Sequence, residues 1–312
     1  MSFEVLLINP VIAALDEALR ARYTVHRLYE HADAQGWLRE IGARIDGVVT
    51  GGASGIGNES MDRLPKLRIV AINGIGTDAV DLDYARSRNI HVSTTPGVLT
   101  DDVADLALGL LLAACRGLCV GDRYVRDGQW RAKAPLPLAR KFSDMKVGIV
   151  GLGRVGRAIA ARAAAFNCAI GYTDLRAMPD VPWRYVGDLH TLASESDALV
   201  LAASADDAEG IVDAHILDAL GRDGWLVNVA RGKLVNEADL VRALVEKRIA
   251  GAGLDVFVDE PNVPEALFAL PNVVLQPHRA SATVQTREAM AKIVLESLEA
   301  SFAGRRPDTS VT

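Results

Sequence analysis

The sequence predicts an α/β protein built around two parallel sheets. Short apolar runs alternate with Ala/Leu-rich helical patterns through most of the 312 residues, which is typical of βαβ units. The apolar runs fall into two groups along the chain, and two groups predict two sheets. The length agrees, because roughly 150 residues per domain gives about two domains, and half of the residues are hydrophobic.

The predicted strands are short and apolar, as expected for strands buried on both faces of a parallel sheet. The first group contains four runs: Val5–Ile8, Gly47–Val49, Ile69–Ile72 and Ile90–Val92. The second group contains six runs: Lys146–Val150, Ala169–Tyr172, Ala198–Leu201, Trp225–Asn228, Gly251–Leu254 and Val273–Leu275.

A long helical pattern separates the two groups and begins in the sequence LTDDVADLAL. Thr100 can cap its first turn, where the two following aspartates also suit the helix dipole. The apolar stretch Val103–Val120 continues the pattern, but Asp105 and Arg116 interrupt it, which favours a buried helix over a membrane span. We expect this helix to carry the chain from one domain to the other.

The segment Gly128–Lys141, GQWRAKAPLPLARK, fits neither a strand nor a helix, because it contains two prolines and several cations. We interpret it as an excursion from the domain. The sequence leaves two roles open for it: a lid over a site, or an arm that contacts a second copy of the chain.

Composition and charge exclude several classes of function. The net charge is −6 and the basic residues form no cluster, so nucleic acid is not an expected partner. The N-terminal sequence MSFEVLLINP lacks the features of a signal peptide, and with no membrane span expected the protein is predicted to be cytoplasmic. The three cysteines form no Cys-x-x-Cys pair, so no disulfide or metal site is predicted, and all three are expected to be buried hydrophobes.

The sequence KVGIVGLGRVG contains a Gly-x-Gly-x-x-Gly fingerprint between a predicted strand and the helical run RAIAARAAAF. The first glycine permits a tight turn, the second lets a pyrophosphate approach the backbone, and the third lets helix and strand pack closely. The helix N-terminus adds unpaired N–H groups for an anion. This context predicts a dinucleotide site formed by Gly151, Leu152, Gly153, Arg154, Val155 and Gly156.

Two side chains after the next strand bear on the choice of dinucleotide. Asp174 lies 23 residues after Gly151, near the roughly 20 expected for the acid that binds the ribose hydroxyls. A carboxylate there would repel the 2′-phosphate of NADP, whereas Arg176 would attract it. The sequence therefore predicts NAD(P) binding and favours NAD.

A histidine, an arginine and two acids follow strands of the second group. His278 follows the last strand in LQPHRASATV, and Arg231 follows an earlier one in VNVARGKLVN. Asp255 and Glu260 follow another strand in GLDVFVDEPN. Ligands bind at the carboxyl edge of such sheets, so these residues offer a cation for a carboxylate, a histidine for a proton and an acid to orient it. The other five histidines are expected on the solvated surface.

These ordered motifs resemble the D-2-hydroxyacid dehydrogenase family. The likeness covers Gly151–Gly156, NVARG, DVFVDEP and Pro277-His278, and it extends over essentially the whole chain, including GGASG and INGIGTDAVDL. The branch that looks most similar contains glyoxylate/hydroxypyruvate, hydroxyphenylpyruvate and 2-ketogluconate reductases. The resemblance implies an oxidoreductase that reduces a small 2-keto acid to a D-2-hydroxy acid with NAD(P)H.

The resemblance also implies how the chain is arranged. A Rossmann dinucleotide-binding domain, residues 99–282, would be inserted in a smaller flavodoxin-like substrate domain. Residues 1–98 would form that substrate domain, and the C-terminal helix, residues 283–312, would return to it. The protein would be a homodimer.

The resemblance assigns roles to residues of both predicted domains. His278 would be the general acid, Glu260 would tune His278, Arg231 would grip the keto acid, and Asp255 would bond the nicotinamide carboxamide. In the substrate domain the expected binding residues share glycine-rich loops, where backbone amides would hold the substrate carboxylate and neighbouring side chains would set the size of the pocket. They are Gly52, Ile75 and Gly76.

Two positions depart from the family pattern. Members that use NADP often have a small residue followed by Arg where this chain has Asp174 and Leu175, which argues against a preference for NADP. The residue after the histidine is commonly apolar, but here it is Arg279. This cation either favours a polyhydroxylated or dianionic substrate or faces solvent.

Two other functions stay open on the sequence. Formate dehydrogenases have similar glycines but generally replace the acid partner by glutamine, so Glu260 argues against them. Scaffolds similar to the C-terminal binding protein corepressors keep a Rossmann core and bind peptides, and the complete Arg, Glu and His set does not exclude them. Turnover discriminates, because a scaffold should bind dinucleotide and reduce keto acids slowly or not at all.

Overall fold

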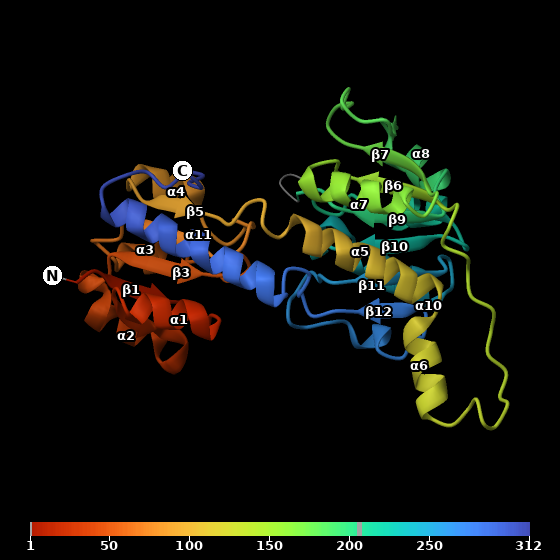
Figure 1. Ribbon diagram of the computed structural model, residues 1–312, viewed down its shortest axis with the longest axis horizontal. Helices are drawn as coiled ribbons and strands as arrows, with labels where there is room; N and C mark the ends of the chain where they lie inside the picture. The colour runs from red at the N-terminus through yellow and green to blue at the C-terminus, as the bar shows by residue number, and fades with distance from the viewer. Residues whose placement is uncertain (1, 205–207) are drawn as a thin grey trace. The chain divides into compact units, whose positions relative to one another are not determined.

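The computed structural model describes residues 2–204 and 208–312, and it divides into two compact units (Figure 1). Unit 1 contains both ends of the chain, Met1–Leu99 and Ser281–Thr312. Unit 2 is the continuous segment between them, Thr100–Ala280.

Unit 1 contains a five-stranded parallel sheet in the order β2-β1-β3-β4-β5. This is the flavodoxin-like strand order: the strands are added toward one side of the sheet up to β2, and then toward the other side from β3 onward. The strands are β1 (Glu4–Leu7), β2 (Thr24–Arg27), β3 (Gly47–Thr50), β4 (Ile69–Ile72) and β5 (His91–Ser93).

Helices cover both faces of this sheet, and each face has its own core. Leu15 and Leu19 of α1 pack with Val294 and Leu298 of α11 on one face. Helices α2, α3 and α4 pack on the other face. The helices are α1 (Ala13–Arg20), α2 (Ala34–Ile41), α3 (Asn58–Asp62), α4 (Leu82–Ser87) and α11 (Val284–Phe302), with short 3₁₀ turns at Leu28–Glu30 and Gly42–Arg44.

Unit 2 contains a seven-stranded parallel sheet in the order β12-β11-β10-β9-β6-β7-β8. Its strand order reverses between β6 and β9, which is where doubly wound sheets of the Rossmann type bind dinucleotides. The strands are β6 (Lys146–Val150), β7 (Ala169–Thr173), β8 (Arg184–Tyr185), β9 (Ala198–Leu201), β10 (Trp225–Asn228), β11 (Gly251–Leu254) and β12 (Val273–Leu275).

Helices also flank this second sheet. Figure 1 shows α5 and α7 together on one side of it, and a side chain at Gly253 of β11 would come within 2.8 Å of Leu110 in α5. The core of the other face includes residues of α8, α9 and α10. The helices are α5 (Thr100–Cys115), α6 (Leu118–Arg126), α7 (Arg154–Ala164), α8 (Leu189–Ser194), α9 (Ala214–Leu220) and α10 (Glu237–Val245), with 3₁₀ turns at Gly232–Leu234 and Glu265–Leu267.

The predicted α/β fold class is confirmed, and most strands lie where the sequence placed them. All ten predicted strands are present, six of them with the predicted bounds. Two strands were missed, β2 and β8. Both residues of β8 are exposed and β2 contains no fully buried residue, so neither has the apolar run by which strands were recognised.

The prediction of one buried helix through Val103–Val120 was wrong in its second half. The helix ends at Cys115, and Gly117 adopts a left-handed conformation with φ 62°, which glycine reaches without steric cost. Helix α6 then starts in a new direction and buries none of its residues. Cys119 lies on it and is exposed, so the expectation that all three cysteines are buried was also wrong.

Among the described residues, no single helix is long and apolar enough to cross a membrane. Helices α5 and α6 pass on length and composition only when taken together, and they are bent by 59° at the break between them.

The segment after α6 is irregular, as predicted for Gly128–Lys141. It begins with a turn at Gly128 and continues without regular structure to the start of β6. The Tyr124 hydroxyl donates to the Ala134 carbonyl oxygen at 2.6 Å, which ties the turn to α6. Trp130 and Leu138 are exposed, with 70% and 102% of their reference areas accessible.

Candidate active site

The loop between β6 and α7 has the backbone that a pyrophosphate requires. Gly151 has φ 88°, and a Cβ there would lie 2.5 Å from the Cα of Ala203. A Cβ at Gly156 would lie 2.0 Å from the Gly151 carbonyl oxygen, so only glycine lets helix and loop approach this closely. A Cβ at Gly153 would meet no atom within 4 Å, which leaves open space at the N-terminus of α7. Backbone and space here therefore fit a dinucleotide phosphate.

Asp174 directly follows the next strand, β7, and accepts a hydrogen bond from the same loop. Its Oδ2 accepts the backbone N–H of Leu152 at 2.7 Å, and its Oδ1 accepts that of Leu175 at 2.7 Å. The carboxylate thus lies beside the glycine loop, where the fingerprint places the group that meets the ribose. Arg154 and Arg176 are exposed, and Val155 is partly buried in the first turn of α7.

The turn after β10 positions Arg231 through a buried side chain. Asn228 is 2% exposed; its Nδ2 donates to the Arg231 carbonyl oxygen at 2.9 Å and its Oδ1 accepts the Ala230 N–H at 3.0 Å. Gly232 packs against the next motif, since a Cβ there would lie 2.0 Å from the backbone of Phe257. The motifs NVARG and DVFVDEP are therefore in direct contact.

Glu260 and His278 form a close pair, although 18 residues separate them. His278 Nδ1 lies 2.6 Å from Glu260 Oε2, and the other oxygen, Oε1, accepts the backbone N–H of Phe257 at 3.0 Å. The His278 side chain is 42% exposed and that of Glu260 25%. Because Nδ1 faces the carboxylate, Nε2 is the ring atom left for a ligand.

Opposing effects set the ionisation of Glu260. Burial alone would raise the pKa of this carboxyl, but the hydrogen bonds from His278 and the Phe257 N–H outweigh it, and the charges of His278 and Arg231 act in the same direction. The net result is a pKa below its ordinary value. Glu260 is thus a carboxylate at neutral pH, and Arg231 lies close enough to act on it.

Asp255 holds the backbone that carries His278. It is fully buried, and its two carboxylate oxygens accept the N–H groups of Arg279 at 2.8 Å and Ala280 at 3.0 Å. Its own carbonyl oxygen accepts the His278 N–H at 2.8 Å. These bonds stabilise His278 at φ 48°, a left-handed conformation that costs a non-glycine residue on the order of 1 kcal/mol.

Burial raises the pKa of the Asp255 carboxyl, and the N–H groups of Arg279 and Ala280 lower it in part. The structure thus gives Asp255 a positioning task that the sequence did not indicate. Its contact with a nicotinamide carboxamide stays a prediction.

The other predicted binding residues lie together in unit 1, in the loops after β3 and β4. A Cβ at Gly52 would lie 2.9 Å from the Gly76 carbonyl oxygen, so the two loops touch through backbone. Ile75 is 40% exposed beside them. Asn9 Oδ1, after β1, accepts the Gly51 N–H at 3.3 Å.

The expectation that the remaining histidines are solvated was wrong for some of them. His26 is only 13% exposed, and its Nε2 lies 2.7 Å from Glu4 Oε2 on the neighbouring strand. Burial lowers the pKa of His91. His190 and His215 stack on each other with ring centroids 4.3 Å apart. Glu4 and the stacked histidines lie far from their partners in the sequence, so local pattern could not reveal these contacts.

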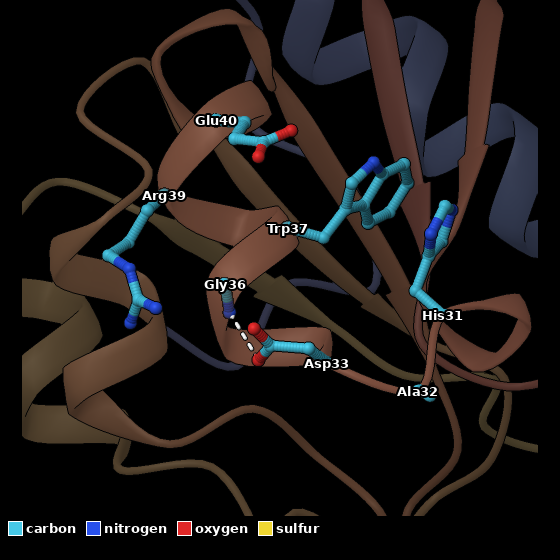
Figure 2. Close-up of a pocket in the computed structure, with 7 residues that line it drawn as sticks. All are labelled: His31, Ala32, Asp33, Gly36, Trp37, Arg39 and Glu40. Atoms are coloured by element: carbon cyan, nitrogen blue, oxygen red, sulfur yellow. Dashed lines mark hydrogen bonds between the residues drawn. The ribbon is translucent and has the colours of Figure 1, made fainter.

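A pocket outside these loops lies around α2 in unit 1. Figure 2 shows the His31 ring beside Trp37, and their centroids are 3.6 Å apart. The pocket is lined by His31, Ala32, Asp33, Gly36, Trp37, Arg39 and Glu40, and it includes none of the predicted site residues. Across the described parts of the chain, no group of three His, Cys, Asp or Glu side chains is placed to hold a metal ion.

Two residues that shape the site were not predicted, Asn228 and Gly232. The sequence signal for them is an asparagine at the end of an apolar run, three residues before Arg-Gly. Such a side chain is expected to bond the turn that follows it.

Comparison with known proteins agrees with this geometry. The family model for the NAD-binding domain of D-isomer specific 2-hydroxyacid dehydrogenases matches residues 108–280. A 2-ketogluconate reductase of Gluconobacter oxydans is 45% identical over 97% of this chain and 96% of its own length. A glyoxylate/hydroxypyruvate reductase A of Arabidopsis thaliana is 44% identical over 97% of each chain.

A solved structure shows the same similarity over the whole fold. The NADPH-dependent glyoxylate/hydroxypyruvate reductase of Sinorhizobium meliloti, in complex with NADP and malonate, superposes with a TM-score of 0.91 at 37% identity. The match covers 100% of this chain and 97% of that one.

Proposed function

This chain belongs to the D-isomer specific 2-hydroxyacid dehydrogenase family, and we propose that it reduces a small 2-keto acid to a D-2-hydroxy acid with His278 as general acid. It is an oxidoreductase that uses NAD(P)H. The observation that carries the proposal is the His278–Glu260 pair beside Arg231, on the same sheet edge as the glycine loop. The relatives are enzymes, which favours this function over a non-enzymatic scaffold.

His278 and Arg231 would act on different groups of the substrate. The protonated ring of His278 donates a proton from Nε2 to the keto oxygen as negative charge develops there. Arg231 pairs its planar fork of donors with the carboxylate and polarises the carbonyl. When bound, the nicotinamide supplies the hydride that reduces the keto carbon.

Glu260 and Asp255 support these groups. The Glu260 carboxylate fixes the orientation of the ring through Nδ1, and its negative charge faces the proton-donating group. Asp255 fixes the backbone of the turn that carries the ring. Arg279, with its side chain exposed beside His278, either selects a second polar group on the substrate or faces solvent.

We assign unit 1 as the substrate domain and unit 2 as the dinucleotide-binding domain. The backbone amides of Ile75 and Gly76 would bind the substrate carboxylate, and the close approach of Gly52 to Gly76 leaves room for a ligand at backbone level. In unit 2 the loop Gly151–Gly156 would hold the pyrophosphate at the N-terminus of α7.

The position of Asp174 favours NAD over NADP. Its carboxylate lies at the glycine loop, where it would accept the ribose hydroxyls and repel a 2′-phosphate. Arg176 is an exposed cation two residues away and would act in the opposite direction.

We further propose a cytoplasmic homodimer. Leu118 and Val125 on α6, together with Trp130 and Leu138 in the arm after it, expose apolar side chains that a second copy would cover. All three cysteines are free thiols, which suits a reducing compartment.

The test is a spectrophotometric panel of glyoxylate, hydroxypyruvate, hydroxyphenylpyruvate and 2-ketogluconate, each with NADH and NADPH. We expect turnover of at least one keto acid, with a product of D configuration. Tight binding of the dinucleotide without turnover of any keto acid would contradict the proposal and favour a scaffold.

A further inference from the structure

Arg287, in the first turn of α11, is a half-buried cation that has no partner among the described residues. No hydrogen bond or ion pair joins its side chain to any residue of the described ranges 2–204 and 208–312. Burial lowers its pKa, and no carboxylate opposes that effect. The arginines with a raised pKa each have an aspartate partner; they are Arg27, Arg126, Arg157, Arg162 and Arg248.

Helical periodicity places Arg287 on the face of α11 that packs on the sheet. Ala291, Val294 and Leu298 pack against β1, β3 and β4, and Arg287 lies four residues before Ala291 on the same stripe. At the other end of the helix, Phe302 stacks on Phe3 before β1. The helix therefore starts at the carboxyl edge of the sheet and ends at the amino edge.

The lengths of helix and strands put Arg287 beyond the strand ends. From Phe302 back to Arg287 the helix axis covers about 22 Å, whereas a four-residue strand covers about 13 Å. Figure 1 shows this end of α11 extending past the strands of unit 1. Thr286, the preceding residue, donates from Oγ1 to the Val98 carbonyl oxygen at 3.2 Å, which joins this turn to the loop after β5.

Two more polar groups at this edge lack a partner among the described residues. Thr95, in the loop after β5, is completely buried, and its hydroxyl has no hydrogen bond. Asn73, directly after β4, has a buried Oδ1 that accepts no hydrogen bond. The Thr95 N–H donates to the Gly74 carbonyl oxygen at 2.8 Å, so the two loops are adjacent. Buried polar groups are rarely left unbonded, which points to a ligand.

We propose that Arg287, Thr95 and Asn73 form a subsite on unit 1 for the hydroxylated chain of a sugar-type 2-keto acid. The proposal rests on the function given above and narrows its substrate class. Arg287 offers only donors, Asn73 Oδ1 only accepts, and the Thr95 hydroxyl does both. A run of hydroxyl groups satisfies all three, because each hydroxyl both donates and accepts.

Other keto acid chains fit these groups less well. A second carboxylate would pair with Arg287 and Thr95 but would offer no donor to Asn73 Oδ1. Glyoxylate has no chain to reach any of them. An aromatic chain would place an apolar ring against buried polar groups and leave them unbonded.

The experiment compares 2-ketogluconate with glyoxylate in purified wild type and in Arg287→Met. We expect the ratio of kcat/KM for 2-ketogluconate to that for glyoxylate to fall on the order of tenfold or more, mainly through the KM for 2-ketogluconate. Thr95→Val, which keeps the shape but removes the hydroxyl, should lower the ratio about threefold to tenfold. The kcat/KM for glyoxylate, whose carboxylate would bind in unit 1, checks that each variant is folded.

A matched control lies on the same helix. Lys292 is exposed and pairs with Glu296 on the solvent face, so Lys292→Met should leave the ratio within about twofold of wild type. An unchanged ratio in Arg287→Met, or equal losses for both substrates, would overturn the subsite. So would a wild type that reduces glyoxylate but not 2-ketogluconate, although the proposed function would then stand. If neither keto acid is reduced with either cofactor, the proposed function fails as well.

Discussion

The carboxyl edges of the two parallel sheets differ in what they present. In unit 2 the edge carries charged side chains that hold one another, as in the 2.6 Å contact between His278 and Glu260. In unit 1 the edge consists of glycine-rich backbone, and its buried groups Asn73 Oδ1 and Thr95 Oγ1 have no partner within the described chain.

We expect the same architecture to serve two different tasks. A group that transfers a proton must be oriented before the substrate arrives, and the bonds to Asp255 and Glu260 provide that orientation. A group that recognises a substrate must keep its bonding capacity for the ligand. We therefore expect substitutions at His278 and Glu260 to act mainly on kcat, and those on the unit 1 edge mainly on KM.

The largest effect expected on the unit 2 edge is that of His278→Ala. Removing the proton donor should lower kcat for keto acid reduction on the order of a hundredfold or more at every pH, with little change in dinucleotide affinity. Steady-state kinetics and titration with NADH measure both. His215→Ala, an exposed position on α9, is the control and should behave as wild type. If kcat falls less than about threefold in His278→Ala, His278 is not the proton donor.

Arg231→Lys should have the next largest effect. One ammonium cannot reproduce the two-pronged contact with a carboxylate, so kcat/KM should fall on the order of tenfold to a hundredfold while NADH affinity stays near wild type. Arg242→Lys on α10, where Arg242 pairs with Asp239, serves as the matched control. If keto acid kinetics are unchanged in Arg231→Lys, the substrate is held by another cation.

Asp174→Ser tests the residue that is expected to meet the dinucleotide ribose at the carboxyl edge of the unit 2 sheet. The change removes the charge that repels a 2′-phosphate and leaves Arg176 to attract it, so the ratio of NADPH to NADH efficiency should rise about tenfold. Asp223→Ser, at an exposed position elsewhere in unit 2, should not move the ratio. A flat or falling ratio in Asp174→Ser would mean that another residue meets the ribose.

Features encoded by local spacing were predictable from the sequence. The glycines at 151, 153 and 156 lie between a strand and a helix, and the whole fingerprint is complete within six residues. Strands β6, β9 and β10 were predictable because their residues are almost all buried, which gives unbroken apolar runs. The edge strands β2 and β8 contain no buried residue and give no such run.

Features that depend on contacts between distant residues were not predictable from local pattern. His278 and Glu260 come from loops after different strands; their shared sheet edge predicted an acid that orients the histidine, and only the family resemblance selected Glu260. Glu4 reaches His26 across neighbouring strands, so the partner of that histidine was missed. The helix break at Gly117 was missed because a lone glycine inside an apolar run is also tolerated within helices.

Glu260→Gln is the change with the smallest expected effect, and it tests whether the pair on the unit 2 edge is coupled electrostatically. The hydrogen bond and the charge of His278 help to hold the pKa of the Glu260 carboxyl below its ordinary value, so Glu260 is a carboxylate at neutral pH. We expect this carboxylate, 2.6 Å from Nδ1, to support the proton that reduction needs, because opposite charges attract. This support is present at neutral pH and disappears only as pH falls through the lowered pKa of Glu260.

Glutamine keeps the shape of Glu260 but removes its charge, so the alkaline limb of kcat/KM for reduction should move to lower pH. Both side chains are partly exposed, so solvent screening should keep this shift small. Oxidation of the hydroxy acid needs the neutral ring, so its rising limb should shift in the same direction. His278→Ala removes the proton donor, so it should lower kcat without shifting the pH profile. Glu260→Gln should shift the pH profile, and the two variants therefore distinguish loss of the donor from loss of the charge beside it. If both limbs stay in place in Glu260→Gln, the carboxylate orients the ring without affecting its charge.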